Sequence, residues 1–345
     1  MSAFRQVAKG IQLFLLGCLL LLTSCENSQP IEHFFEGFTP PSHFPKEHYS
    51  FDNNPPSQAG FELGRKLFYD PLLSRTGQIS CASCHQQQAN FADEGKAFSQ
   101  GVDGQLGTRH SPAMANLAWN PNFMWDGGIN HIEVMPVAPI TNPLEMDESL
   151  SNVVQKLKAS KQYTSLFKAA FNQPQITDQQ LLFALAQFMG LMISDNSKYD
   201  RYVNGKAHYT LEEEVGKKLF DTFCTSCHQG VLQTNFSFKN NGLDTVFSDK
   251  GRATITLLAK DEGLFKVPSL RNIAQSAPYM HDGRFSTLLE VVNHYNSGVK
   301  KSSTLSNELN LEMNLSESDK EAIVAFLLTL SDYTYLNNSK FSKPD

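Results

Sequence analysis

The sequence has no block of Lys and Arg long enough to follow a nucleic-acid backbone, and its 35 acidic residues outnumber its 29 Lys and Arg residues. A formal net charge of −6 argues against a nucleic-acid partner and is compatible with a small basic protein partner. Alternating strand-like patterns are also scarce, so we expect a mainly α fold. With 41% hydrophobic residues, the 345-residue chain excludes wholesale disorder and is long enough for about two domains.

The apolar run Ile11 to Leu22 is too short to span a bilayer, which takes about 20 residues. It follows a positively charged start and is typical of an export signal. It ends in Leu22-Thr23-Ser24-Cys25, which resembles the lipobox of bacterial lipoproteins. We therefore expect residues 1–25 to be a lipoprotein signal peptide. Cys25 is then the lipid anchor that holds the protein on the periplasmic side of a membrane, and an ordinary signal peptide is the alternative.

The six cysteines leave little room for disulfide bonds. Cys18 lies in the apolar run and Cys25 is the expected lipidation site. The other four form two copies of Cys-x-x-Cys-His, which is the attachment signature of a c-type haem: the thiols add to the haem vinyl groups and the His binds iron. A redox Cys-x-x-Cys site or a four-cysteine zinc site requires no His after the second Cys. We expect two covalently bound haem c groups, held by Cys81, Cys84 and His85 and by Cys224, Cys227 and His228.

A repeat precedes each haem motif, Glu62 to Phe68 in the first copy and Glu214 to Phe220 in the second. Apolar residues spaced as on one helix face predict the first helix of a cytochrome c unit in each copy. Gly64 and Gly216 within them allow another helix to approach closely. In the second copy Thr210 and Glu213 form a capping-box pattern, a helix start. Further helices are expected over 177–193, 285–295 and 316–330.

These patterns divide the chain into segments. Residues 26–59 are rich in proline, which suits an extended tether. We expect an N-terminal cytochrome c domain over 60–200 and a C-terminal one over 201–345, whose tail can pack back on the first domain. Long loops, common around buried cofactors, are expected over 101–107 and 233–250.

Two further motifs accompany the haem motifs and the helix repeat. They are Pro268-Ser269-Leu270-Arg271-Asn272 and Tyr279-Met280-His281-Asp282-Gly283. Together they resemble the bacterial dihaem cytochrome c peroxidases, and the MauG-type enzymes share the pattern. The resemblance covers about residues 60–335. It implies an N-terminal domain whose haem reacts with peroxide and a C-terminal domain whose haem transfers electrons.

For the second haem, the resemblance implies His228 as the proximal iron ligand and Met280 as the ligand on the far side. A thioether ligand raises the reduction potential and closes the sixth iron position, which fits electron transfer. His281 is the reserve candidate. MauG enzymes have Tyr where this chain has Met280, which favours the peroxidase branch.

For the first haem, the resemblance implies a distal pocket built from 124–127 and 142–146, with Pro139 nearby. Glu145 matches the catalytic carboxylate, which moves a proton from the inner to the outer peroxide oxygen before the O–O bond breaks. Trp125 matches the Trp that lies between the two haems and mediates electron transfer. Core packing is the alternative for Trp125.

Three departures from the family pattern stand out. Val102 occupies the position where many relatives carry a His that blocks the first iron, so we expect this iron to stay open in the oxidised state. The alternative is that His110 or His131 takes the place of the blocking His. Met135 stands where the pocket usually has Gln. His110 stands where relatives have the Asn of an interdomain calcium site. Calcium prefers oxygen ligands, so a nitrogen at this position weakens the inference, and Ca²⁺ is kept only as an open alternative.

The predicted function is that of an oxidoreductase, a cytochrome c peroxidase that reduces hydrogen peroxide to water. Its electrons are expected from a small periplasmic cytochrome c or cupredoxin. One alternative is a MauG-like oxidase that modifies amino acids of a partner protein. Another is a dihaem electron carrier without a substrate, which requires both irons to be six-coordinate. Because relatives commonly dimerise, a homodimer is compatible with this prediction.

Overall fold

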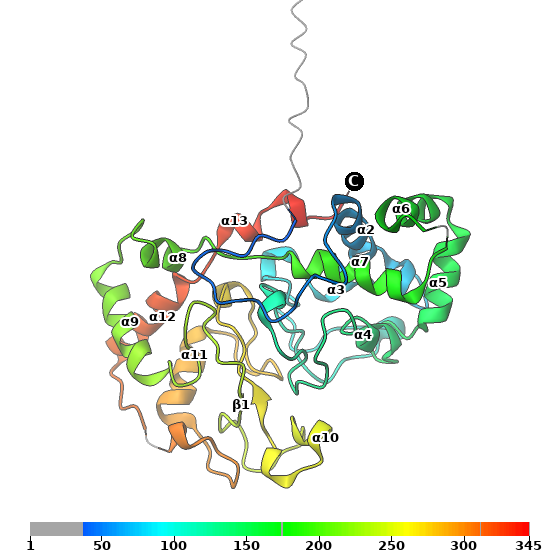
Figure 1. The fold of residues 1–345 in the computed structure, drawn as a ribbon. Helices are drawn as coiled ribbons and strands as arrows, with labels where there is room; N and C mark the ends of the chain where they lie inside the picture. The colour runs from blue at the N-terminus through cyan, green and yellow to red at the C-terminus, as the bar shows by residue number, and fades with distance from the viewer. Residues whose placement is uncertain (1–36, 174, 311, 345) are drawn as a thin grey trace, which may run out of the picture. The chain divides into compact units, whose positions relative to one another are not determined.

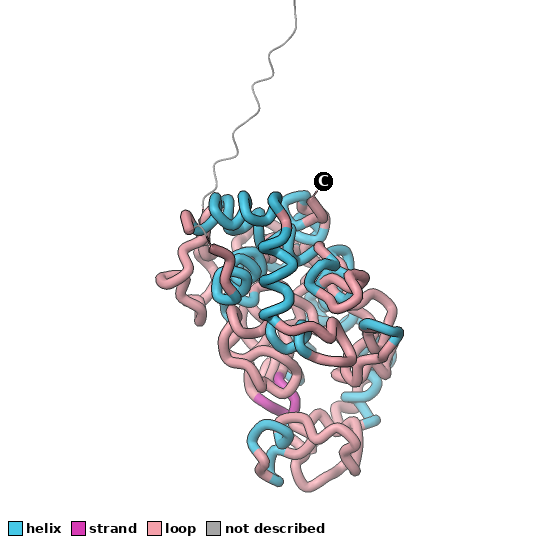
Figure 2. The backbone as a smooth tube through the Cα atoms, turned by 90° about the vertical axis from the view of Figure 1, so that its right-hand side faces the viewer, coloured by secondary structure: helices cyan, strands magenta, loops and turns pink. Residues whose placement is uncertain are grey.

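The chain folds mainly into helices joined by long loops (Figure 1, Figure 2). The computed structural model describes residues 37–173, 175–310 and 312–344. The expected signal peptide and Cys25 lie outside them. In this described part, no helix is long and apolar enough to cross a membrane. The helices are α2 Gln58–Tyr69, α3 Cys81–Cys84, α4 Val137–Thr141, α5 Leu150–Ala159, α6 Lys161–Phe171, α7 Asp178–Gly190, α8 Lys198–Val203, α9 Leu211–Phe223, α10 Ala253–Thr256, α11 Leu288–Asn293, α12 Glu317–Leu328 and α13 Tyr333–Leu336. The strands β1 Phe238–Lys239 and β2 Phe265–Lys266 pair antiparallel.

Two helix pairs form the centre of the two halves. In the first half α2 packs against α7, and in the second α9 packs against α12. Each pair crosses at the glycine that the repeat predicts. A methyl group on Gly64 would lie 1.9 Å from the carbonyl oxygen of Ala184, and one on Gly216 would lie 1.8 Å from that of Ala322. The prediction that these glycines allow close helix contact is confirmed.

The expected helix starts agree with the structure. Thr177, Thr210 and Ser316 cap α7, α9 and α12, each accepting a backbone N–H three residues on. The capping box of Thr210 and Glu213 is present as predicted.

The helix expected over 285–295 is shorter than predicted. It begins at Leu288, because Thr287 and Glu290 form a capping box there and Phe285 still pairs with Tyr279. It continues into a π turn, His294–Gly298.

The prediction of an extended tether over 26–59 is wrong for residues 37–57, while 26–36 lie outside the described residues. Phe44 and Tyr49 are buried. The Phe44 ring meets Trp119 edge-on at 5.0 Å, and Trp119 Nε1 donates to the Pro45 carbonyl oxygen at 2.8 Å. This segment therefore packs on the helical body, since its aromatic side chains find apolar partners far along the chain.

The end of the chain lies against the first half. Gln87 Nε2 donates to the Asn338 carbonyl oxygen at 2.8 Å, and Tyr69 donates its hydroxyl to the Phe341 carbonyl oxygen at 2.8 Å. Arg65 on α2 donates to the Lys340 carbonyl oxygen at 3.2 Å. The last residues thus contact α2 rather than the half that precedes them.

A buried ion pair joins the middle of the chain to the second half. Arg271 and Asp200 are each 1% exposed, and the Arg271 guanidinium donates to both Asp200 oxygens at 2.5 Å. Arg271 also donates to the carbonyl oxygens of Ser194 and Val231. Asp200 lies on α8, the helix that crosses the expected domain boundary after residue 200.

Adding a methyl group at either helix crossing should destabilise the protein. We expect Gly64→Ala and Gly216→Ala each to lower the free energy of unfolding by about 1–3 kcal/mol, because the new atom overlaps a backbone carbonyl. Denaturant unfolding followed by circular dichroism measures the change. Gly107→Ala is the matched control, since its methyl group lies 3.6 Å from the nearest atom. Wild-type stability of both crossing variants would contradict the helix contact.

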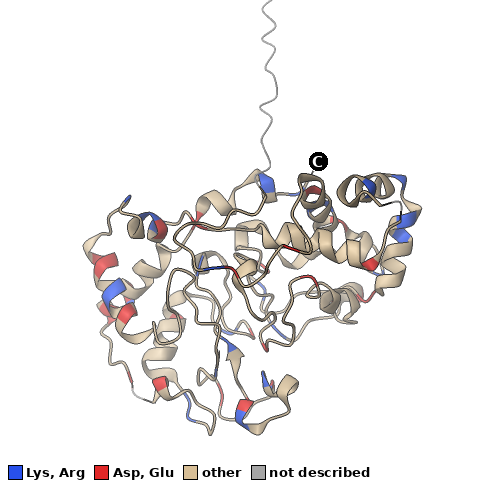
Figure 3. Cartoon of the chain, in the orientation of Figure 1, with Lys and Arg blue, Asp and Glu red and all other residues tan. Residues whose placement is uncertain are grey.

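Removing Asp200 should cost far more than removing a surface carboxylate. We expect Asp200→Ala to lower the free energy of unfolding by about 3–5 kcal/mol, because the Arg271 charge stays buried without its partner. Acidic and basic residues both lie along α9 (Figure 3). Asp221→Ala, which breaks the exposed pair with Lys217 on this helix, should cost below about 1 kcal/mol. Equal effects in urea unfolding would show that the buried pair carries no special weight.

Candidate functional site

The first Cys-x-x-Cys-His motif forms a single helical turn. Cys81–Cys84 is α3, and His85 follows as its C-cap residue. His85 Nδ1 lies 2.6 Å from the Phe91 carbonyl oxygen, and because a carbonyl only accepts, Nδ1 must donate. The lone pair of this ring is then on Nε2. Burial lowers the pKa of His85, which keeps the imidazole neutral as metal binding requires.

The second motif repeats this chemistry at the end of α9. Cys224 is the C-cap residue of α9, and His228 donates its backbone N–H to the Cys224 carbonyl oxygen at 2.8 Å. His228 Nδ1 lies 3.1 Å from the Gln233 carbonyl oxygen, so its lone pair is also on Nε2. Burial lowers the pKa of His228 to about 4.

The four cysteines of the two motifs form no disulfide bonds with one another. Burial raises the pKa of Cys81 and of Cys224 to about 12 each. Within the described ranges, no group of three or more His, Cys, Asp or Glu residues is placed to hold a metal ion by itself. Two thiols and one oriented imidazole per motif fit a covalently bound haem.

Glu145 lies beside the first motif. Its charge acts on the Cys81 and Cys84 thiols and contributes to their raised pKa values. Burial raises the pKa of Glu145, while a hydrogen bond from Asn142 Nδ2 at 2.7 Å opposes the increase. A partly buried carboxyl with a raised pKa is suited to hold and release a proton during a reaction.

The loop that carries Val102 is fixed to the Glu145 segment. Val102 donates its backbone N–H to the Glu145 carbonyl oxygen at 2.8 Å. A methyl group on Gly101 would lie 2.2 Å from the Leu144 carbonyl oxygen, so the two segments touch backbone to backbone. The Val102 side chain is 2% exposed and offers no ligand atom.

Trp125 lies where the two halves meet. Its Nε1 donates to the His110 carbonyl oxygen at 2.7 Å, and its carbonyl oxygen accepts the backbone N–H of Lys266 on β2 at 2.8 Å. Lys266 also donates from Nζ to the Asn122 carbonyl oxygen at 2.8 Å, and burial lowers the pKa of Lys266 to about 8. The contact between Lys266 and Trp125 had no signal in the local sequence, because it joins distant segments of the chain.

Met280 is linked to the second motif through Asn241 and Tyr295. Asn241 Nδ2 lies 3.3 Å from the Met280 sulfur. Tyr295 connects the two places: burial raises the pKa of Tyr295 to about 12, a hydrogen bond with Asn241 opposes the increase, and the Cys224 and Cys227 thiols add to it. Asn241 is a contact that the sequence analysis did not identify.

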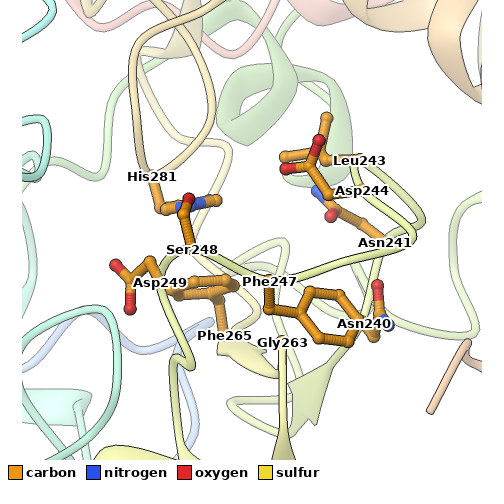
Figure 4. A pocket seen from close by; sticks show the side chains of 10 residues that line it. All are labelled: Asn240, Asn241, Leu243, Asp244, Phe247, Ser248, Asp249, Gly263, Phe265 and His281. Carbon is orange, nitrogen blue, oxygen red and sulfur yellow. The ribbon is translucent and has the colours of Figure 1, made fainter. Parts of the chain in front are cut away.

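His281, the reserve ligand candidate, is engaged elsewhere. Its ring stacks on Phe265 with centroids 3.8 Å apart, in the pocket that Figure 4 shows. Its carbonyl oxygen accepts the backbone N–H of His110 at 2.7 Å. This leaves Met280 as the better placed of the two candidates.

The two other histidine candidates, His110 and His131, make contacts with neighbouring residues. His110 Nδ1 lies 2.9 Å from the Lys96 carbonyl oxygen, and its buried Nε2 has no hydrogen-bond partner among the described residues. His131 is exposed and lies 3.5 Å from Glu133.

Arg109, the residue before His110, holds two carboxylates. It donates to both Asp249 oxygens, at 2.6 and 2.9 Å, and pairs with Asp126 at 2.5 Å. The guanidinium thus neutralises both carboxylates next to the position considered for calcium.

Two helical halves with matching haem motifs define a dihaem cytochrome c. The family model "Di-haem cytochrome c peroxidase" matches residues 58–208, and the model "Cytochrome c" matches 213–331. The chain is 35% identical to the methylamine utilization protein MauG of Methylorubrum extorquens over 288 residues, covering 80% of this chain and 79% of that protein. It is 34% identical to the cytochrome c551 peroxidase of Nitrosomonas europaea over 278 residues, covering 78% and 79%. The chain therefore belongs to the di-haem cytochrome c peroxidase family.

Solved structures agree with this assignment. A MauG-like protein associated with microbial copper homeostasis superposes with a TM-score of 0.83 at 32% identity, covering 89% of this chain and 99% of that one. The diheme peroxidase BthA from Burkholderia thailandensis, at 22% identity and a TM-score of 0.70, shares the fold. The predicted family, the mainly α fold with two cytochrome c-type domains and the oxidoreductase class are confirmed.

The raised pKa of Glu145 predicts a pH-dependent stability. The native state binds the Glu145 proton more tightly than the unfolded state, so stability falls as pH rises from the ordinary glutamate range through the raised pKa. We expect Glu145→Gln, which cannot ionise, to lose less stability over that rise, as urea unfolding of the haem-loaded protein at several pH values will measure. Glu94→Gln, at an exposed site, should keep the wild-type slope. Equal slopes for all three proteins would contradict the burial of this carboxyl.

Proposed function

We propose that the protein is a cytochrome c peroxidase that reduces hydrogen peroxide to water with electrons from a small redox protein. Peroxide reacts in the N-terminal domain, residues 60–200, and electrons enter through the C-terminal domain, residues 201–345. The observation that carries the proposal is the buried Glu145 carboxyl beside the first haem motif, which a plain electron carrier does not need. The similarity to a cytochrome c551 peroxidase supports the same reaction.

Haem c, when bound through the two cysteines of each motif, supplies an iron that takes peroxide or carries electrons. His85 and His228 would hold the irons through Nε2, because each Nδ1 donates to a backbone carbonyl. Glu145 takes the proton of the inner peroxide oxygen and delivers it to the outer oxygen, which then leaves as water. Asn142 keeps the carboxyl in place by its hydrogen bond.

Two electrons and two protons convert each hydrogen peroxide into two water molecules. Met280 would be a second protein ligand, beside His228, of the haem in the C-terminal domain, and a haem held by two protein ligands would serve electron transfer. Trp125, at the contact between the halves, passes electrons from the second centre to the first. The donor is a small cytochrome c or cupredoxin, and the lipobox-like pattern supports a protein exported to the periplasmic side and anchored through Cys25.

A second candidate is a MauG-like oxidase that modifies a partner protein. The similarity to MauG of Methylorubrum extorquens and to a MauG-like structure favours it. Met280 argues against it, since MauG enzymes resemble this chain but carry Tyr at that position. Rapid consumption of peroxide in the presence of a reduced small cytochrome c, without any other protein, distinguishes the peroxidase from the oxidase.

The catalytic role of Glu145 predicts a large loss on substitution. We expect Glu145→Gln to lower kcat/KM for hydrogen peroxide by about 10²–10⁴-fold, because the amide cannot move the proton. Oxidation of reduced cytochrome c by the haem-loaded protein measures the rate. Glu148→Gln is the matched control, because Glu148 is held by Lys156 at 2.5 Å.

Wild-type kcat/KM in Glu145→Gln would remove Glu145 from the mechanism. A wild-type protein that consumes no peroxide with any reduced donor, yet exchanges electrons with it, would instead identify an electron carrier.

A further inference from the structure

The two halves share a second repeat, downstream of the haem motifs. Residues 112–127 and 268–283 both follow the pattern Pro-x-x-x-Asn-x-Ala, then four residues, then aromatic-Met-x-Asp-Gly. In this correspondence Met124 matches Met280, and Phe123 matches Tyr279. The proposed ligand of the second iron thus has a counterpart of the same residue type in the first half.

The backbone of the two segments is the same at its unusual points. Met124 and Met280 have φ angles of 64° and 74°, a left-handed conformation that is uncommon for a residue other than glycine. Asn116 and Asn272 are also left-handed, with φ angles of 59° and 58°. A chain adopts such a conformation twice, at corresponding residues, only where the surrounding structure imposes it.

Hydrogen bonds within the turns repeat as well. Phe123 donates its N–H to the Ile129 carbonyl oxygen at 2.6 Å, and Tyr279 donates to that of Phe285 at 2.7 Å. The carbonyl oxygens of Met124 and Met280 each accept an N–H from the glycine three residues on, at 3.3 Å. The Cα–Cβ bond of each methionine therefore leaves its turn in the same direction.

Each turn is attached in the same way to the helix pair of its own half. Asn116 donates its N–H to the Met192 carbonyl oxygen at 2.8 Å, just after α7, and Asn272 donates to that of Leu330 at 3.0 Å, just after α12. The aromatic residues before the methionines are buried, with Phe123 3% and Tyr279 7% exposed, while both methionines are partly exposed. Each methionine turn is thus attached at the same point of the helix pair of its half.

We propose that Met124 is the sixth ligand of the N-terminal iron in the resting protein, its thioether facing the side opposite His85. This inference rests on the proposed function, in which haem is bound at both motifs and Met280 ligates the second iron. It replaces the open iron expected from Val102 alone. Peroxide would then have to replace a neutral thioether at the first iron, whereas the Met280 sulfur has the additional contact with Asn241.

The test is electron paramagnetic resonance of the haem-loaded diferric protein, with wild type, Met124→Leu and Met280→Leu compared. We expect two low-spin haems in the wild type and one high-spin haem in each variant, each variant altering a different haem. Azide should bind Met124→Leu at least about tenfold more tightly than wild type, because no thioether competes for the iron. Met114→Leu is the matched control, since the second copy has Leu270 at the corresponding position.

A high-spin haem in the wild type, or a Met124→Leu spectrum identical to that of the wild type, overturns the inference. Peroxide turnover measured on the same samples reports separately on the proposed function, which survives if turnover persists.

A second measurement needs no stable Met124 variant. In the reduced wild-type protein labelled with ¹³C-methyl methionine, an iron-bound methionine lies over the haem ring, and its methyl resonance moves strongly upfield. We expect two such resonances, and Met280→Leu removes one of them. One upfield resonance or none in the wild type overturns the inference.

Discussion

The burial of the Arg271 guanidinium is the constraint on which the arrangement of the chain depends. A cation removed from water needs its hydrogen bonds satisfied, and Arg271 finds them on Asp200 and on carbonyl oxygens from two other segments. The Phe44 ring lies 4.9 Å from the same guanidinium, and His43 contacts Asp200 at 3.1 Å. One side chain thereby joins the N-terminal segment, the connection between the halves and the segment that leads to Met280.

The structure duplicates one unit, and most of what the sequence predicts correctly follows from that. The haem motifs and the capping residues such as Thr210 involve residues only a few positions apart, so their sequence patterns determine the local structure. The crossing glycines contact a distant helix, but they could be recognised because they recur in both copies of the repeat. The proximal imidazoles could be assigned to iron for the same reason. Their orientation could not, because the carbonyl oxygens that accept from Nδ1 belong to loops without a periodic pattern.

Prediction fails where a contact depends on residues distant in the sequence. The prolines before Ser57 favour an extended backbone. The packing of Phe44 on Trp119, however, has no signal in the local sequence. The same holds for Lys266 beside Trp125 and for the Val102 loop on the Glu145 backbone. The partial burial of Glu145, which raises its pKa, likewise depends on the tertiary structure and is absent from the sequence pattern.

The tail that lies on α2 has a consequence for the order in which the protein folds. Arg65 and Lys340 are separated by 275 positions, and Tyr69 and Phe341 by 272. During synthesis α2 and α7 emerge long before the residues that cover them, so the first half spends this interval with part of its surface exposed. Loops that close over such separations form slowly. The contacts that cover α2 can therefore form only when the end of the chain is present, so the half made first is the one that waits for the last residues.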